Sequence, residues 1–218
     1  MAIRKDITTQ PVYEFGQMTG KPLEYYSGVF ASLDPEEIAE RTRVPYDAAR
    51  RRFTLTIMGA AHTVDWPDAK FDSADPYARI LMLRYLDEGR CIPPTGKYVA
   101  YNELPWGDVY GSNFQGRVIR RFVRTFGNDL DTFKSIMENT PGLNAERVEK
   151  CDVGYKFDFM NGLPMKILVW EGDDEFPPAA QILYDETVAF GYTAEDIAVA
   201  GDILINRLKS LRASLITE

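Results

Sequence analysis

The sequence contains little cysteine and almost no histidine. Its 218 residues include two cysteines, Cys91 and Cys151, and one histidine, His62. Two cysteines so far apart form no CxxC motif, no four-cysteine iron–sulfur ligand set and no disulfide framework, so we expect both to be small buried hydrophobic side chains. One histidine excludes a histidine-rich zinc or iron site within one chain. His62 has no serine or cysteine motif around it and gives no catalytic triad.

The chain also lacks an excess of positive charge and any long apolar run. Asp and Glu total 33 against 25 Lys and Arg, a net charge of −8. Nucleic acids and anionic membranes are bound by clustered cationic charge, so this balance argues against both. No stretch approaches the ~18 continuous apolar residues of a membrane helix, and the N-terminus shows no apolar signal-peptide segment. We therefore expect a cytoplasmic protein with no nucleic-acid and no membrane partner.

The residues that are present predict a folded α+β protein. Hydrophobic residues make up 45% and aromatic residues 12%, as in ordinary globular chains. Apolar alternation predicts strands at 52–59, 61–66, 97–101, 151–159, 165–170 and 181–184, with Asn161-Gly162 as a hairpin turn. Caps and helical spacing predict helices that start at Asp34-Pro35, Asp75-Pro76, Ser112 or Asn113, Leu130 and Thr193. Since no βαβ rhythm appears, we expect antiparallel hairpins packed with amphipathic helices in a single globular domain.

Two parts of the chain are distinguished by their patterning. Residues 1–33 show no clear periodicity and are interpreted as an N-terminal extension that packs on the core. Its aromatic residues would make that contact: Tyr13, Phe15, Tyr25 and Tyr26. Residues 34–218 are predicted to form the single α+β domain.

Four carboxylates follow the predicted strand that ends at Trp170, namely Glu171, Asp173, Asp174 and Glu175. Such oxygen ligands could hold Mg²⁺ or Ca²⁺, or two of them could share a proton as acid and base. The spacing of an EF-hand is absent, so a solvated acidic turn is the favoured interpretation and no metal site is predicted.

Three arginines lie along one face of the helix that is predicted to start at Ser112 or Asn113. Arg117, Arg121 and Arg124 lie at i, i+4 and i+7, opposite Phe114 and Phe122. Arginines in such a row can hold a phosphate or carboxylate with paired hydrogen bonds. A solvated or ion-paired face of an amphipathic helix is the favoured interpretation.

The three tryptophans lie at predicted strand ends or turns. Trp66 precedes Pro67, Trp106 precedes Gly107, and Trp170 ends a predicted strand. Aromatic faces can stack on a flat ligand, so these side chains could line a pocket. Edges of the core would place them equally well.

Six segments of the chain carry a resemblance to a known family. In order they are ILMLRYL at 80–86, YVAYNELPWG at 98–107, FQGRVIRRFVRTFG at 114–127, LVWEGDDEFP at 168–177, ILYD at 182–185 and TAED at 193–196. Together they resemble the uncharacterised "domain of unknown function" family 3786 of anaerobic bacteria and archaea, over roughly residues 35 to 213. Members of that family often lie beside a four-cysteine iron–sulfur domain, whose cysteines this chain lacks.

The resemblance implies an anaerobic, cytoplasmic setting near one-carbon or corrinoid metabolism, with a small-molecule ligand or an iron–sulfur or corrinoid protein as partner. It implies no catalytic residues and no particular cofactor. Whether the chain is an enzyme stays open at this point.

Three functional hypotheses follow. The first is a ligand- or partner-binding accessory module, with Trp106 and Trp170 lining the site and Asp173, Asp174 and Glu175 at its rim. The second is a divalent-cation-dependent enzyme that uses the Glu171–Glu175 carboxylates, with Arg117 and Arg121 holding a phosphorylated substrate. The third is a structural subunit of a complex, which would expose an apolar patch.

Overall fold

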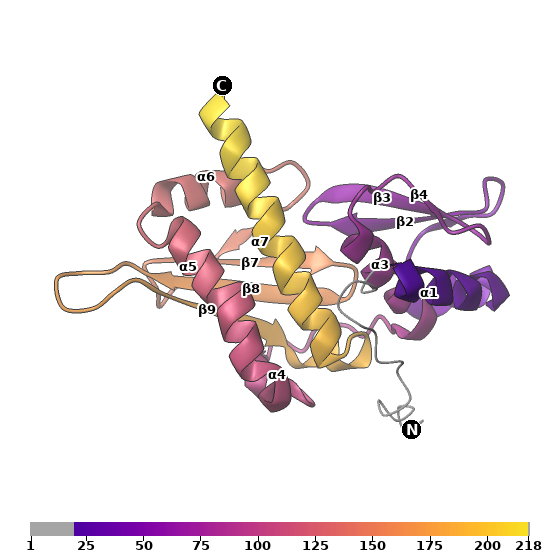
Figure 1. Ribbon diagram of the computed structural model, residues 1–218, viewed down its shortest axis with the longest axis horizontal. Helices are drawn as coiled ribbons and strands as arrows, with labels where there is room; N and C mark the ends of the chain where they lie inside the picture. Colours follow the sequence, from indigo (N-terminus) through magenta and orange to yellow (C-terminus); the bar gives the residue numbers. More distant parts are fainter. Residues whose placement is uncertain (1–19, 218) are drawn as a thin grey trace.

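The computed structural model describes residues 20–217 (Figure 1). The helices are α1 (Gly20–Ser32), α2 (Pro35–Thr42), α3 (Pro76–Glu88), α4 (Gly107–Phe114), α5 (Arg120–Phe126), α6 (Leu130–Asn139) and α7 (Ala194–Thr217). The strands are β1 (Tyr46–Asp47), β2 (Arg52–Ile57), β3 (Ala60–Asp65), β4 (Lys70–Phe71), β5 (Tyr98–Ala100), β6 (Glu146–Arg147), β7 (Val153–Met160), β8 (Leu163–Trp170) and β9 (Ala179–Asp185). A π-helical segment, Gln115–Ile119, joins α4 to α5.

All strands belong to one antiparallel sheet with the order β4-β3-β2-β7-β8-β9-β5, and β1 and β6 pair with β2 and β7. The predicted α+β fold of antiparallel hairpins and helices is confirmed. The two halves of the sheet meet at a narrow join, because β2 and β7 are in register only at Ile57 and Met160. The Met58 amide adds a 2.7 Å hydrogen bond to the Phe159 carbonyl at this join.

Helices cover one face of the β7–β8–β9 half of the sheet (Figure 1). On β7, Tyr155 packs edge-on against Phe133 of α6, with ring centroids 5.8 Å apart. Phe133 in turn contacts Phe122 and Phe126 of α5. These rings are fully buried, and each contributes about 1.5–3 kcal/mol through the burial of apolar surface.

The other half of the sheet carries the N-terminal helices. Helix α1, which lies within the predicted extension, packs against α3, and Phe30 of α1 is buried against Phe53 of β2. Tyr26 reaches the buried Arg84 guanidinium of α3. The predicted contacts of Tyr13 and Phe15 lie outside the described residues.

The helix starts that the caps predicted are confirmed at three places. Asp34 accepts hydrogen bonds from the amides of Glu36 and Glu37, and Asp75 does the same at the start of α3. At α7 the bonds are reciprocal: the Thr193 amide donates to Asp196 Oδ2 at 2.8 Å, and the Asp196 amide donates to Thr193 Oγ1 at 3.2 Å. The local sequence therefore fixes these termini.

Two expectations differ from the structure. Helix α4 begins at Gly107 rather than near Ser112, because Trp106 adopts a left-handed conformation (φ 66°) that turns the chain into the helix. A side chain at Gly107 would lie 1.8 Å from the Tyr101 carbonyl oxygen, so this start needs glycine. Cys91 and Cys151 are half-buried rather than buried.

Among residues 20–217, no helix combines the length and the apolar character that crossing a membrane requires.

Candidate functional site

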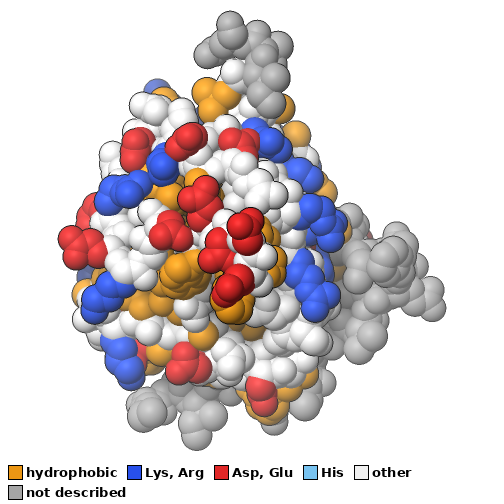
Figure 2. Space-filling view, turned by 90° about the vertical axis from the view of Figure 1, so that its left-hand side faces the viewer, with side chains coloured by type: hydrophobic (Ala, Val, Ile, Leu, Met, Phe, Trp, Pro, Cys, Tyr) orange, Lys and Arg blue, Asp and Glu red, His pale blue; other side chains and the backbone are white. Residues whose placement is uncertain are grey.

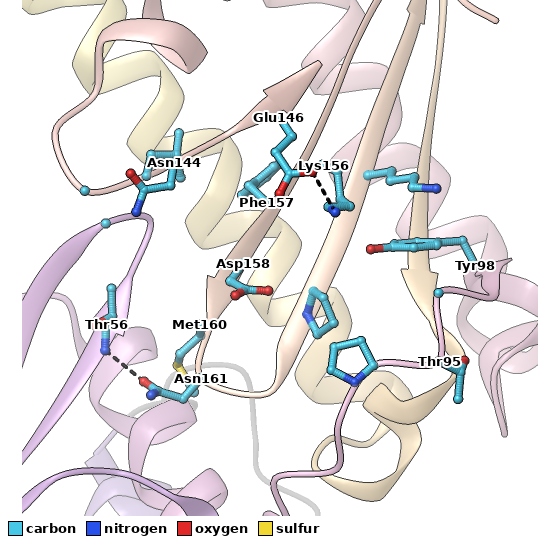
Figure 3. Close-up of a pocket in the computed structure, with 17 residues that line it drawn as sticks. Thr56, Thr95, Tyr98, Asn144, Glu146, Lys156, Phe157, Asp158, Met160 and Asn161 are labelled. Atoms are coloured by element: carbon cyan, nitrogen blue, oxygen red, sulfur yellow. Dashed lines mark hydrogen bonds and ion pairs between the residues drawn. The ribbon is translucent and has the colours of Figure 1, made fainter. Parts of the chain in front are cut away.

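A cavity of about 940 Å³ opens on the face of the sheet opposite the helices (Figure 3). Successive residues of a strand point to opposite faces. Because Tyr155 packs on α6, its neighbour Lys156 and then Asp158 project from the open face. Pro164 and Lys166 of β8 continue the floor of the cavity.

One rim of the cavity is a contact between two turns. Gly59 (φ +79°) follows β2, and Gly142 (φ +75°) follows α6. A Cβ atom on Gly59 would lie 2.4 Å from the Leu143 amide nitrogen, and one on Gly142 would lie 2.6 Å from the Gly59 carbonyl oxygen. The two backbones therefore touch directly, which only glycine permits.

A side-chain bridge closes the same rim. Asn161, in the β7–β8 turn, accepts a 2.8 Å hydrogen bond from the Thr56 amide of β2 through its Oδ1 atom (Figure 3). This bond holds the β2–β3 hairpin against the β7–β8 turn, where pairing of β2 with β7 is limited to a single position. The glycine contact holds the same hairpin against the loop that follows α6.

The opposite wall is the segment 94–97, which Asp185 at the end of β9 fixes to the sheet. The Asp185 carboxylate is fully buried and accepts hydrogen bonds from the Gly96 amide at 2.7 Å, the Thr95 amide at 3.2 Å and the Thr187 hydroxyl at 2.8 Å. Burial acts to raise the pKa of Asp185, but these hydrogen bonds outweigh it and lower the pKa. The wall is thus held by an ionised, well-bonded carboxylate.

Two lysines stand side by side on the floor. Lys156 and Lys166 are directly opposite each other in the β7–β8 register, an arrangement of like charges that is unfavourable by itself. Each ammonium has a different partner that offsets this repulsion. Lys156 Nζ forms a 2.8 Å ion pair with Glu146, and Lys166 Nζ lies 3.8 Å from the centroid of the Tyr98 ring.

Tyr98 of β5 points its hydroxyl into the cavity (Figure 3). Burial raises the pKa of Tyr98 to about 12, and the nearby carboxylates of Asp185, Asp158 and Glu146 add to the shift. The hydroxyl therefore stays protonated and can donate a hydrogen bond at any physiological pH.

Asp158 lies near the centre of the cavity (Figure 3). Within the described part of the chain its carboxylate makes no hydrogen bond and no ion pair, although the side chain is open to the cavity. The surrounding walls remove enough water to raise the pKa of Asp158, and the Lys156 charge opposes that shift only in part. The carboxylate is exposed to the cavity and has no partner among the described residues, so it is free to accept a hydrogen bond from a ligand.

The predicted arginine pair faces helix α7 instead of the cavity. Arg121 Nη1 lies 2.7 Å from Asp202 Oδ1, and its Nη2 donates to Asn206 Oδ1 at 2.6 Å. Arg117 pairs with the other oxygen of Asp202. These contacts are those of an ion-paired helix face.

The acidic segment forms the loop between β8 and β9, which projects from the molecule (Figure 1). Asp173 Oδ1 accepts hydrogen bonds from the amides of Glu175 at 2.8 Å and Phe176 at 2.7 Å. These bonds lower the pKa of Asp173. Figure 2 looks onto this end of the molecule and shows acidic side chains gathered beside hydrophobic ones, with Lys and Arg toward the margins. Among residues 20–217, no group of three or more His, Cys, Asp or Glu side chains is placed to hold a metal ion.

The two tryptophans lie at the end of β8 and at the start of α4. Trp170 is half-buried, whereas Trp106 is 62% exposed, next to the exposed Val109 and Tyr110. None of the predicted site residues lines the 940 Å³ cavity, and none lines a smaller cavity of about 280 Å³ beside β9 and α4. Those predicted residues are Trp106, Trp170, Asp173, Asp174, Glu175, Arg117 and Arg121.

Sequence reasoning did not find the cavity residues, although one signal was available. The charged residues Lys156 and Asp158 alternate with aromatic residues along β7, which predicts an open polar face on that strand. Tyr98 and Glu146 come from distant parts of the chain, and nothing in the sequence links them to β7.

Comparison with known proteins places the chain in a family. No curated protein and no solved structure matches it. A family model described as Domain of unknown function (DUF3786) matches residues 34–207, which is most of the chain. The chain therefore belongs to the DUF3786 family of domains of unknown function.

Proposed function

We propose that this chain is a ligand-binding module whose binding site is the cavity on the open face of β7 and β8. The observation that carries the proposal is Asp158, a carboxylate without a hydrogen-bond or ion-pair partner among the described residues, near the centre of a cavity of about 940 Å³. Cavities of about 300–1,000 Å³ with a few convergent polar groups are typical of small-molecule sites.

The cost of this arrangement supports a functional interpretation. Because the pKa of the exposed Asp158 is raised in the folded protein, its ionised form is less favourable there than in the unfolded chain. Side chains that disfavour folding in this way are concentrated at functional sites, where a ligand supplies the missing contact. Asp158 is the clearest such side chain in the cavity, because the other charged lining residues, Glu146, Lys156 and Lys166, all have partners.

The construction of the walls supports binding as well. The Gly59–Gly142 contact fixes one rim, and the Asp185 hydrogen bonds fix the other. A site that is already in its binding shape loses less conformational entropy when the ligand arrives. The cavity therefore has the rigidity expected of a binding site.

The wider role that we propose is accessory, in the cytoplasm and in anaerobic metabolism near corrinoid or one-carbon chemistry. This part rests on the family resemblance of segments such as residues 168–177, and an iron–sulfur or corrinoid protein as partner rests on it too. Relative to the sequence-based hypothesis, the proposed site moves from Trp106 and Trp170 to the cavity around Asp158.

The test is a thermal-shift screen of a metabolite library on anaerobically purified protein. A ligand at a hundredfold excess over its Kd stabilises the folded state by about 2.7 kcal/mol. We expect hits whose effect is lost in Asp158→Ala and retained in the matched control Asp174→Ala, an exposed carboxylate in the β8–β9 loop.

Other results would favour the alternatives. Hits that depend on Trp106 and Trp170 and ignore Asp158 would refute the cavity as the site. Stabilisation by Mg²⁺ that disappears in Asp173→Ala would favour the cation-dependent enzyme. A stable complex with another protein, together with no small-molecule hit, would favour the structural subunit.

A further inference from the structure

We infer that the ligand of this cavity is a zwitterion, with an ammonium group that binds Asp158 and a carboxylate that binds Lys166, the two separated by a short aliphatic chain. This inference rests on the proposed function and adds the chemical class of the ligand.

The cationic end of the ligand is assigned by Asp158. Its carboxylate faces the centre of the cavity (Figure 3) and makes neither a hydrogen bond nor an ion pair within residues 20–217. An ammonium group has three donors and no acceptor, which matches two free carboxylate oxygens.

The anionic end is assigned by Lys166. In the described part of the chain its ammonium has no carboxylate at ion-pair distance and lies over the Tyr98 ring at 3.8 Å. A cation–π contact at a partly exposed site is worth roughly 0.5–1 kcal/mol, whereas a hydrogen bond to a charged group is worth about 1.5–3 kcal/mol. A ligand carboxylate can therefore recruit Lys166 without breaking a strong contact. Lys156, directly opposite, already has Glu146 at 2.8 Å.

The overall charge of the lining points the same way. Tyr98 stays protonated and neutral, and the other ionisable lining residues are Glu146, Asp158, Lys156 and Lys166, whose charges sum to zero when all four are ionised. A ligand with one charge would satisfy one end and leave the other without a partner. A neutral molecule with two opposite charges satisfies both.

The strand geometry sets the distance between those charges. Lys166 stands opposite Lys156, and Asp158 follows Lys156 by two positions on the same face. Lys166 and Asp158 are therefore diagonal neighbours on adjacent strands, about 7–8 Å apart. The extended zwitterion 5-aminopentanoate has a comparable span between its charged groups.

The experiment is isothermal titration of the full chain with three probes of equal length: 5-aminopentanoate, pentylamine and pentanoate. We expect the zwitterion to bind at least about tenfold more tightly than either singly charged probe. Pentylamine lacks the contact with Lys166, and pentanoate lacks the contact with Asp158. Asp158→Asn should reduce binding of 5-aminopentanoate to the level of pentanoate, and Lys166→Gln should reduce it to the level of pentylamine. The matched controls Asp174→Asn and Lys209→Gln are exposed and lie outside the cavity lining; they should leave all three affinities unchanged.

The possible failures are distinguishable. If pentanoate or pentylamine binds as tightly as the zwitterion, and does so through Asp158 or Lys166, the zwitterion inference is wrong and the proposed binding site stands. The same holds if the metabolite screen yields only singly charged or uncharged ligands that depend on Asp158. If no probe binds and no metabolite depends on Asp158, both the inference and the proposed function fail.

Discussion

Replacing Gly59 by alanine tests whether the rim of the cavity is built as described. Gly59 has φ +79° and touches the turn at Gly142 through backbone atoms alone. An added Cβ would lie 2.4 Å from Leu143 N, 2.5 Å from Gly142 C and 2.6 Å from the Pro141 carbonyl oxygen. Ordinary contacts between such atoms are near 3.5 Å or longer, so the two turns must move apart by about 1 Å.

The expected loss of stability has two parts. A left-handed φ costs a residue with a Cβ atom roughly 1–2 kcal/mol, and forcing extra volume into a packed contact costs about 1–3 kcal/mol more. We therefore expect Gly59→Ala to lower the free energy of unfolding by about 2–5 kcal/mol.

Gly96→Ala is the matched control for this substitution. Gly96 has the same φ of +79°, and an added Cβ there meets nothing within 4 Å. The Gly96→Ala variant should lose only the free energy that the left-handed φ costs, about 1–2 kcal/mol. The smaller entropy of the unfolded alanine chain, worth about 0.4–1 kcal/mol, affects both variants equally and cancels in the comparison.

The assay is unfolding in urea, monitored by tryptophan fluorescence. The free energy of unfolding of each variant is obtained from its linear dependence on urea concentration. Gly59→Ala should lose more stability than Gly96→Ala, by the 1–3 kcal/mol of the backbone contact. Equal losses would refute the direct contact between the two turns, and with it the fixed rim of the cavity.

Three further substitutions probe the charged groups. Asp158→Asn should raise the melting temperature at pH 7, because the pKa of Asp158 is raised in the folded state by burial; the gain should vanish as pH falls below about 4, where the carboxyl group is protonated in both states. Asp185→Ala should lower stability by about 1–3 kcal/mol or more, and because the pKa of Asp185 is lowered on folding, the difference from wild type should be full above about pH 4 and shrink as pH falls further. Arg84→Met should cost about 3–5 kcal/mol, since it leaves the buried Asp196 carboxylate without the guanidinium that donates to it at 3.1 Å; chemical denaturation measures this loss, and a loss below 1 kcal/mol would contradict a buried ion pair.

Local signals predicted the elements that local physics determines. Asn161-Gly162 forms the β7–β8 turn, where Gly162 has φ +67°, and the reciprocal Thr193–Asp196 hydrogen bonds start α7. Each depends on a few consecutive residues, so the sequence contains all that is needed to predict it. The start of α4 was missed because Gly107 and Gly111 are poor helix formers, and because Trp106 takes a left-handed conformation that its residue type disfavours.

The candidate site depends on contacts between distant residues, and for that reason the sequence did not predict it. The acidic loop and the tryptophans attracted attention because their residues are concentrated along the chain. The cavity instead combines Tyr98 of β5, Glu146 of β6 and Asp158 of β7, which the sheet order brings together. Strand pairing of this kind is set by packing over the whole domain.

Hydrogen-exchange mass spectrometry tests the central claim most directly. The protein would be compared with and without a metabolite that stabilises it. Binding in the cavity predicts slower amide exchange in its two loop walls, with no change at 106–110 or 171–176. These walls are residues 94–97 and the turn after α6, residues 141–145, three of which line the cavity. Slower exchange at 106–110 and 171–176, with the two walls unchanged, would contradict the account and return the site to the tryptophans and the acidic loop.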